Sequence, residues 1–261
     1  MNKTAMITGA SGGIGLELAK IHAKNGDDLI LVARSQEKLK QIKEDLENNY
    51  DISVIIFIKD LSLPNSSHEL YDEIKSKKVK VDYVINNAGF GYFGKFSETD
   101  WQKELNMINL NITSLVLMTK LFIKDMMLTG GGRIMNVASI AAFMPGPLMS
   151  IYYASKSFVL SFSEAIAEEL DGSNISVTAL CPGPTETDFQ KNAELDNSNL
   201  FKRLSVADVK TVAEYGYKAM LEGKRIAIPG IMNKITAQTH RFFPRTLITR
   251  SVKMIQEESK P

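Results

Sequence analysis

Residues 4–33 read TAMITGASGGIGLELAKIHAKNGDDLILVA, in which an apolar run, a glycine-rich turn, a helical pattern and a second apolar run follow one another. Thr4–Thr8 and Leu29–Ala33 are short apolar segments typical of buried strands, and Leu16–Asn25 has the period of an amphipathic helix. Gly26 ends this helix, because glycine readily adopts the backbone conformation found just after a helix. The stretch therefore predicts a βαβ unit with two parallel strands in one sheet.

The same alternation of strand and helix continues along the chain. Seven strands separated by helices are typical of a mostly parallel sheet with helices on both faces. We therefore expect one Rossmann-like, doubly wound α/β domain over residues 1–230, with residues 231–261 as a helical, basic and apolar extension of the same domain. Further strands are predicted at 53–58, 83–86, 133–137, 176–181 and 225–229, and further helices at 37–48, 66–75, 101–128, 150–170 and 206–222.

The composition limits the classes of function. The 261 residues carry a formal net charge of +1, whereas nucleic-acid-binding domains present a concentrated basic face, so no nucleic-acid partner is expected. Cys181 is the only cysteine and the three histidines are scattered, so no metal site is expected. The strand pattern begins at Thr4, which leaves no room for a signal peptide, and no apolar run reaches the roughly 20 residues that span a bilayer. We expect a cytoplasmic protein.

The glycine-rich turn between the first strand and the first helix predicts a dinucleotide site. Glycines let the backbone approach a pyrophosphate closely, and the amide groups at the helix N-terminus meet its charge. A glycine-rich turn by itself is weak evidence, but its position directly after a strand, near the start of the chain, favours nucleotide binding. The residues expected to contact the cofactor here are Gly9, Ser11, Gly12, Gly13, Ile14 and Gly15.

The end of the second strand bears on the choice between the two nicotinamide cofactors. An acidic residue there would bind the adenosine ribose and repel a 2′-phosphate, but residues 32–35 read VARS. Arg34 can pair with a 2′-phosphate and Ser35 can donate a hydrogen bond to it, which predicts NADP(H), although an arginine after a strand is also common on protein surfaces. Asp60 and Leu61, after the third strand, are expected beside the adenine; an aspartate there can also begin a helix.

Tyr152 and Lys156 stand four residues apart, so a phenol and an ammonium share one helix face. Together with the glycine turn, the run Asn86-Asn-Ala-Gly89 and Ser139, thirteen residues before Tyr152, this pair resembles the short-chain dehydrogenase/reductase family. The resemblance extends roughly from residue 4 to residue 188. It implies that the cofactor is also contacted by Asn87, Ala88, Gly89, Tyr152, Lys156, Pro182, Gly183, Thr185 and Thr187.

The resemblance also implies the roles of the catalytic residues. Tyr152 would be the general acid or base for a carbonyl or alcohol substrate, with its pKa lowered by Lys156 and by the oxidised nicotinamide ring. Ser139 would hydrogen-bond the same substrate oxygen, and Lys156 would also bind the nicotinamide ribose. The fourth catalytic residue of the family is an asparagine on the long helix. Asn111 fits its spacing best, and Asn109 is the second choice.

Apolar side chains near these residues are candidates for a substrate pocket. Tyr153 points about 100° away from Tyr152 around the helix and is expected to pack rather than to transfer protons. Met144, Leu148 and Met149 either line an apolar pocket or belong to the core. The same two interpretations hold for Phe90, Tyr92 and Phe93.

Two segments near the C-terminus have weaker patterns. Residues 188–208 correspond to the lid that shapes substrate specificity in the family, and their apolar side chains are Phe189, Leu195, Leu200, Phe201 and Leu204. Residues 233–256 combine apolar and basic side chains in a helical pattern. Such a helix can lie on an anionic membrane, but packing over the substrate cleft or against another subunit is favoured. The family commonly forms dimers or tetramers through two long helices, so a homodimer or homotetramer is expected.

The predicted function is therefore that of an NADP(H)-dependent oxidoreductase that interconverts an apolar carbonyl compound and its alcohol. Within enzymes, the alternatives are a 3-oxoacyl-thioester reductase and a steroid-like dehydrogenase. A nucleotide-binding regulatory protein that keeps the fold without turnover is the alternative from another class. Ser139, Tyr152 and Lys156 argue against it, because a regulatory protein has no need for all three.

Overall fold

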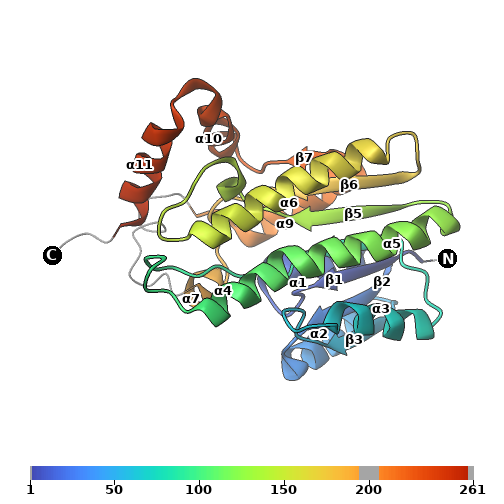
Figure 1. The fold of residues 1–261 in the computed structure, drawn as a ribbon. Coiled ribbons are helices and arrows are strands. Elements are labelled where there is room, and N and C mark those ends of the chain that lie inside the picture. Colours follow the sequence, from blue (N-terminus) through green and yellow to red (C-terminus); the bar gives the residue numbers. More distant parts are fainter. Residues whose placement is uncertain (1, 194–205, 258–261) are drawn as a thin grey trace.

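The chain forms one seven-stranded sheet, and the computed structural model describes residues 2–193 and 206–257. The strand order is β3-β2-β1-β4-β5-β6-β7, and every neighbouring pair is parallel (Figure 1). The predicted doubly wound α/β fold is confirmed, and the sheet is parallel throughout. The strands are β1 (Thr4–Thr8), β2 (Asp28–Ala33), β3 (Val54–Ile58), β4 (Tyr83–Asn86), β5 (Gly132–Val137), β6 (Ile175–Leu180) and β7 (Ile226–Ala227).

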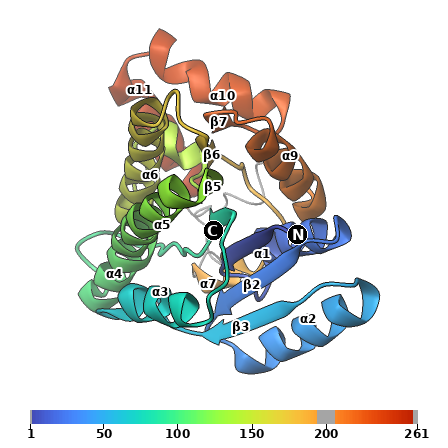
Figure 2. The same ribbon diagram turned by 90° about the vertical axis from the view of Figure 1, so that its right-hand side faces the viewer.

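The helices divide between the two faces of the sheet, as Figure 2 shows. One face carries α1 (Gly13–Lys24), α2 (Gln36–Asn49) and α9 (Val209–Leu221). The other carries α3 (Ser66–Ser76), α4 (Trp101–Ile108), α5 (Leu115–Thr129) and α6 (Ser150–Glu169). Two shorter elements are the 3₁₀ turn η2 (Ile140–Phe143) and α7 (Phe189–Asn192).

Each face of the sheet has its own apolar core. Ile7 pairs in register with Leu31 and Ile85, and all three lie in the core beneath α1 and α2. Their neighbours Met6 and Ile30 point to the opposite face and pack with residues of α3 and α5. This alternation is the normal period of a strand, and coverage of both faces explains why the strands are almost wholly apolar.

The long helix that was predicted over 101–128 contains an irregular turn. A π-helical segment, η1 (Asn109–Ser114), lies between α4 and α5 and shifts the side chains that follow it relative to a regular helix. The whole helical stretch, Trp101–Thr129, is long and apolar enough to span a membrane by length and composition, which corrects the expectation that no such segment exists. In this fold Met118, Phe122 and Met126 from that stretch are buried against the sheet and α3.

The C-terminal segment forms two helices instead of the single one expected over 233–256. These are α10 (Ile231–Phe242) and α11 (Arg245–Gln256), separated at Pro244, and they stand at one end of the molecule (Figure 1). Proline lacks the amide hydrogen that a continuing helix needs, which explains the break. Of the predicted lid, Phe189 begins α7, whereas Leu195, Leu200, Phe201 and Leu204 lie outside the described residues.

Candidate active site

The predicted site residues gather where the parallel strands end. The glycine turn follows β1, the segment that begins with Asn87 follows β4, Ser139 follows β5 and Pro182 follows β6. Because these four strands are neighbours in the sheet and parallel, their carboxyl ends lie along one edge. The order of the strands reverses between β1 and β4, and ligands bind at such a switch point in open α/β sheets.

Ser139 and Tyr152 are brought together across the loop between β5 and α6. The Ser139 hydroxyl caps the η2 turn by accepting a hydrogen bond from the amide of Ala141 at 3.1 Å, and it lies 3.4 Å from the carbonyl oxygen of Pro182. Tyr152 lies in the first turn of α6, and its phenol is hydrogen-bonded to Ser139. The two hydroxyls therefore converge on one place at the carboxyl edge, as the family resemblance implies.

Burial governs the protonation of Tyr152 and Lys156. Burial raises the pKa of the Tyr152 phenol to about 12, and the hydrogen bond with Ser139 offsets only part of this rise. Burial also lowers the pKa of the Lys156 ammonium to about 8. In the chain alone the Tyr152 pKa thus moves opposite to the expectation that Lys156 would lower it. The Lys156 Nζ donates to the Val137 carbonyl at 2.9 Å and lies 5.8 Å from the centre of the Tyr152 ring. A neutral phenol at pH 7 is suited to donating a proton.

Asn111, and not Asn109, faces the site. Its Nδ2 donates to the carbonyl of Phe90 at 3.0 Å and to Oγ of Ser155 at 3.1 Å, and its Oδ1 accepts from the amide of Phe90 at 3.2 Å. Asn111 is buried and lies in the π-helical turn, whereas Asn109 stays half-buried on the same turn. A β-carbon at Gly89 would lie 3.0 Å from the Asn111 Oδ1 and 3.3 Å from the Lys156 Nζ. This geometry favours Asn111 as the asparagine of the site.

Thr8 was not predicted to have a role, yet it joins the glycine turn to the segment after β4. Its Oγ1 accepts hydrogen bonds from the amides of Asn87 and Ala88, each at 3.0 Å. The side chain of Asn87 in turn donates to the carbonyl oxygens of Thr8 at 3.0 Å and Gly9 at 3.2 Å. The sequence signal for this role of Thr8 is its position, as a hydroxyl residue directly before the glycine turn. These bonds fix the turn in place at the switch point.

The glycine turn has the geometry needed for a pyrophosphate. Gly9 has a φ of 66°, which favours glycine, and a β-carbon at Gly15 would lie 2.5 Å from Nδ2 of Asn87. Gly12 is the N-cap residue of α1 and offers no side-chain cap, so the amides of the first turn point to the space in front of the helix N-terminus. Thr187 lies against Gly13 from the segment after β6. The turn therefore fits a dinucleotide phosphate bound at a helix N-terminus.

Arg34 is the exposed cation at the end of β2. Its side chain is 77% exposed, and its Nη1 lies 3.9 Å from Oδ2 of Asp60. Ser35 is the N-cap of α2, and its hydroxyl oxygen accepts a hydrogen bond from the amide of Lys38 and so stabilises the start of the helix. Lys38 was not predicted; its Nζ lies 3.8 Å from Oδ2 of Asp188. Two cations, Arg34 and Lys38, thus flank the start of α2.

Asp60 and Leu61, both predicted beside the adenine, differ in the group that each could offer to a cofactor. Asp60 Oδ1 accepts from the amide of Ser62 at 3.0 Å and from its hydroxyl at 2.6 Å, so the carboxylate organises its own turn. The Leu61 side chain is buried in the core beneath the sheet. Any contact that Leu61 makes with a cofactor would therefore come from its backbone.

Beyond Tyr152 lies an apolar cluster that combines α6, α11 and the intervening loops. Met149 and Tyr153 are buried there with Ile248 and Val252 of α11, and the partly buried Met144, Phe93 and Phe189 pack against them. The ring of Phe189 lies 5.3 Å from that of Tyr152. The Tyr153 hydroxyl accepts from Nε2 of Gln256 at 2.6 Å, so Tyr153 packs and also anchors α11. Packing of this tail over the substrate cleft or against another subunit was favoured from the sequence, and in the structure Gln256 of α11 bonds to Tyr153, 103 positions earlier in the chain.

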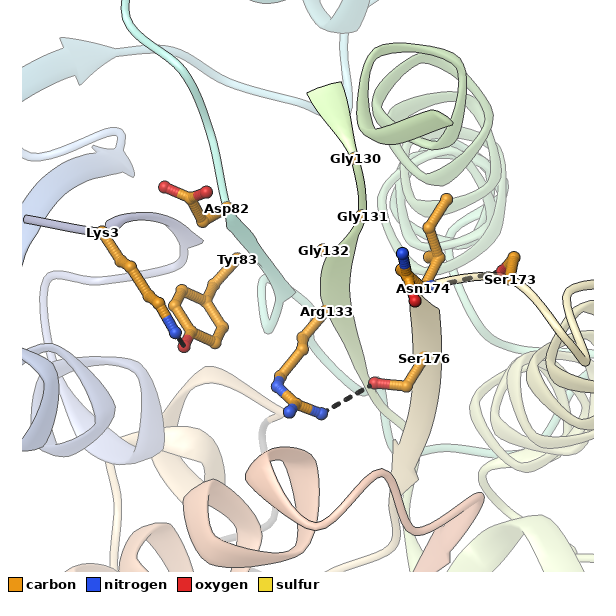
Figure 3. Close-up of a pocket in the computed structure, with 11 residues that line it drawn as sticks. Lys3, Asp82, Tyr83, Gly130, Gly131, Gly132, Arg133, Ser173, Asn174 and Ser176 are labelled. Atoms are coloured by element: carbon orange, nitrogen blue, oxygen red, sulfur yellow. Dashed lines mark hydrogen bonds between the residues drawn. The ribbon is translucent and has the colours of Figure 1, made fainter. Parts of the chain in front are cut away.

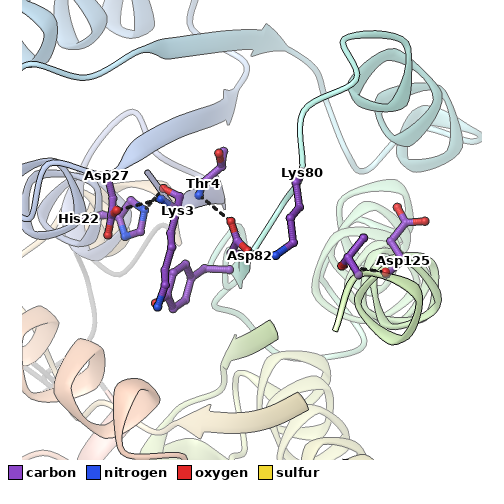
Figure 4. A network of polar contacts seen from close by, with 9 residues as sticks. Lys3, Thr4, His22, Asp27, Lys80, Asp82 and Asp125 are labelled. Carbon is purple, nitrogen blue, oxygen red and sulfur yellow. Dashed lines mark hydrogen bonds and ion pairs between the residues drawn. The ribbon is translucent and has the colours of Figure 1, made fainter. Parts of the chain in front are cut away.

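A hollow of about 480 Å³ lies at the opposite edge of the sheet (Figure 3). Its polar groups have partners of their own: Asp82 pairs with Lys80 and accepts from the amide of Thr4 (Figure 4). Arg133 Nη1 lies 3.3 Å from Oγ of Ser176. None of the predicted site residues lines this hollow. Over residues 2–193 and 206–257 no group of three metal-ligating side chains occurs.

Comparisons with known proteins agree with this geometry. A family model described as short chain dehydrogenase matches residues 3–198. Mouse 17-beta-hydroxysteroid dehydrogenase type 3 is 35% identical over 196 residues, which cover 73% of this chain and only 63% of that protein. Rat very-long-chain 3-oxoacyl-CoA reductase is 29% identical over 244 residues, covering 90% of this chain and 76% of that one. A short-chain dehydrogenase from Sphingobium yanoikuyae, solved in complex with NADPH, is 27% identical with a TM-score of 0.82, covering 93% and 97% of the two chains.

Proposed function

The chain belongs to the short-chain dehydrogenase family, and from this premise we propose that it is an NADP(H)-dependent oxidoreductase that interconverts a bulky apolar ketone or aldehyde and its alcohol. One observation carries the proposal. Tyr152, a phenol kept neutral by burial and hydrogen-bonded to Ser139, stands between the dinucleotide cradle and an apolar cluster. A partly buried acid beside an apolar cluster is an arrangement suited to protonating a carbonyl oxygen.

In the direction of reduction, Tyr152 gives its phenolic proton to the carbonyl oxygen, while the carbonyl carbon gains a hydride. When bound at this edge, a nicotinamide would supply that hydride with its electron pair, or would accept one in the reverse direction. Ser139 hydrogen-bonds the same oxygen and positions it for transfer. The products are an alcohol and a phenolate on Tyr152. The Lys156 ammonium, 5.8 Å from the centre of the Tyr152 ring, stabilises that phenolate until a proton from solvent restores the neutral phenol.

Asn111 supports this chemistry by holding the loop over which the nicotinamide would lie. Its bonds to both backbone groups of Phe90 and to Ser155 connect the segment after β4 to α6. The Asn111 Oδ1 and the Lys156 Nζ both approach Gly89. Asn111 therefore positions Lys156 relative to the cofactor site, and a water held near Oδ1 would connect the ammonium to solvent.

The preference for NADP(H) rests on the cations at the start of α2. No acidic residue ends β2, and Arg34 is exposed beside Lys38. Both can pair with a 2′-phosphate, and the weak, exposed contact of Arg34 with Asp60 costs little to break. The Sphingobium relative was solved with NADPH, which supports the same choice.

An apolar substrate is supported by the side chains beyond Tyr152. Met149, Ile248 and Val252 offer no charged group to bind a polar substrate. The names of the mouse and rat relatives describe a steroid and a very-long-chain acyl thioester, and the steroid skeleton and the acyl chain are both bulky and apolar. We propose a substrate of that general kind.

A panel of carbonyl compounds tests this function. Steroid ketones, 3-oxoacyl thioesters and simple aldehydes would each be assayed with NADPH and with NADH. We expect turnover of bulky apolar ketones with preference for NADPH. Cofactor binding without turnover of any compound would favour a regulatory role, and preference for NADH would overturn the role of Arg34.

A further inference from the structure

The inner face of α10 is fixed to the body of the protein. Ala237 is fully buried, and the ring of His240 stacks on Phe143 of the η2 turn with ring centres 6.3 Å apart. Asn233 donates to the carbonyl of Pro229 at 2.7 Å and packs against Gly183, where a β-carbon would lie 2.6 Å from its side chain. These contacts determine which face of α10 points outward.

That outward face is apolar. Ile231, Ile235 and Phe242 are 76%, 55% and 78% exposed. At about 100° per residue, their positions fall within about 40° of one another around the helix. An amphipathic helix normally buries its apolar side, so α10 is turned the opposite way. Single exposed apolar residues are ordinary, but a row of them on one face marks an interaction site.

The exposed apolar residues continue beyond α10. Met232 is exposed beside Ile231, and Phe243 and Leu247 are exposed in the turn and at the start of α11. The inner face of α11 is buried, because Ile248 and Val252 pack with Met149 and Tyr153 in the apolar cluster beside Tyr152. We define the tail surface as Ile231, Met232, Ile235, Phe242, Phe243 and Leu247.

The tail surface lies in the most basic part of the chain. Residues 231–256 contain five lysines and arginines and no acidic residue, so they carry a formal charge of +5. The whole chain carries +1, which leaves −4 for the remaining residues. Among the described residues, Arg241, Arg245 and Arg250 form no ion pair with a carboxylate. The apolar surface is therefore accompanied by cations available to anionic groups.

We propose that the tail surface docks the protein onto an anionic lipid bilayer as a peripheral membrane contact. A bilayer interface accepts isoleucine, methionine and phenylalanine at the level of the headgroups, and anionic headgroups attract the neighbouring arginines. A second copy of the chain fits less well, because two segments of charge +5 would face each other. Docking also brings α11, whose inner face packs in the apolar cluster beside Tyr152, to the source of apolar compounds. The proposal does not depend on turnover.

Co-sedimentation of the full chain with vesicles tests the proposal. Vesicles of phosphatidylcholine alone would be compared with vesicles that also contain phosphatidylglycerol, at low and high salt. We expect binding to the anionic vesicles, weakened by salt, and little binding to phosphatidylcholine alone. No binding of the wild-type chain to the anionic vesicles would overturn the proposal.

Two double variants separate the contributions to binding. Ile235→Ser/Phe242→Ser removes apolar contact, and Arg241→Glu/Arg245→Glu reverses charge; each should lower the partition coefficient about tenfold or more. Because all four side chains are exposed, both variants should keep the melting temperature of the wild type. Met127→Ser/Leu128→Ser, at the exposed far end of α5, is the matched control and should bind as the wild type does. Equal binding by all variants would refute the assignment. A change in oligomeric state with unchanged vesicle binding would instead identify a subunit contact.

Discussion

Tyr152 and Ser139 are hydrogen-bonded to each other although they lie thirteen residues apart, on either side of the loop that connects β5 to α6. The bond places two hydroxyl groups where a single carbonyl oxygen can contact both. Its two partners differ in origin, since Ser139 is held by the η2 turn and Tyr152 by the first turn of α6. The position of the pair therefore depends on the fold and not on the flexible side chains alone.

Replacing Tyr152 with phenylalanine should remove the proton donor and leave the rest of the site in place. We expect kcat to fall by about 100-fold or more, with the Kd for NADPH nearly unchanged. The matched control is Tyr153→Phe, which loses the hydrogen bond to Gln256 but not the proton donor, and should keep kcat within a few fold. Steady-state kinetics and cofactor titration measure both. Equal losses in the two variants would show that the effect is structural.

The pH dependence of reduction should report Lys156. Burial lowers the pKa of its ammonium to about 8, so the group is charged below that pH and neutral above it. Since the charged form favours the Tyr152 phenolate, kcat/KM should decline as the pH rises through about 8. Tyr152 itself, with a pKa of about 12, stays protonated over this range. In Lys156→Arg the cation persists, and any remaining activity should decline only at higher pH. An unchanged alkaline limb in the variant would rule out Lys156 as its source.

Arg34→Ala tests the choice of cofactor. A charge-assisted contact with a phosphate contributes roughly 1.5–3 kcal/mol, so the Kd for NADPH should rise by about 10- to 100-fold while that for NADH changes little. Lys40→Ala is the control, because Lys40 is an exposed cation of α2 away from the end of β2. Isothermal titration of each variant with both cofactors gives the comparison. A parallel loss for NADPH and NADH would place Arg34 outside the 2′-phosphate site.

His22 should make the folded state sensitive to acid. It is fully buried, its Nδ1 lies 2.7 Å from the Tyr217 hydroxyl, and burial lowers its pKa from 6.5. Above pH 6.5 the imidazole is neutral in both the folded and the unfolded chain. As the pH falls below 6.5, the unfolded chain takes up a proton that the folded chain excludes, so the free energy of unfolding decreases.

The contribution of His22 is isolated by substitution. His22→Gln should be less stable at neutral pH by about 1–3 kcal/mol, because a buried hydrogen-bonded group is lost. It should also lose less of its remaining stability than the wild type does on acidification. His68→Gln, at an exposed position of α3, should behave as the wild type at both pH values. Urea unfolding at neutral and mildly acidic pH distinguishes the wild type from the two variants. If the stability of His22→Gln fell with pH as much as that of the wild type, His22 would not be the source of the acid sensitivity.

The sheet could be predicted from the sequence because each of its strands has a strong local pattern. The glycine turn and the spacing of Tyr152 and Lys156 are local too, and the structure brings these residues to one edge of the sheet. The π-helical turn at Asn109–Ser114 has no such pattern. It is accompanied by the bonds of Asn111 to Phe90, which lies 21 residues earlier, and these long-range contacts support the choice of Asn111 over Asn109 that the family spacing favours.

Other properties depend on surroundings that the sequence pattern does not show. Whether the Tyr152 pKa rises or falls is decided by burial, which residue spacing does not reveal. The break at Pro244 did have a local signal, since proline ends helices. No local signal shows that α11 buries its apolar face whereas α10 exposes its apolar face. Both helices show the same mixture of apolar and basic residues in the sequence, yet α11 buries Ile248 and Val252 while α10 exposes Ile235 and Phe242. That difference arises from contacts with η2 and Tyr153.

The most direct test of the central claim is the fate of the hydride. NADPH carrying deuterium at the transferable position of the nicotinamide would be incubated with a bulky apolar ketone, and the alcohol would be analysed by mass spectrometry and NMR. We expect one deuterium on the new carbinol carbon, in a single configuration, with wild-type protein and almost none with Tyr152→Phe. Label transfer that is as fast with Tyr152→Phe as with the wild type would contradict it.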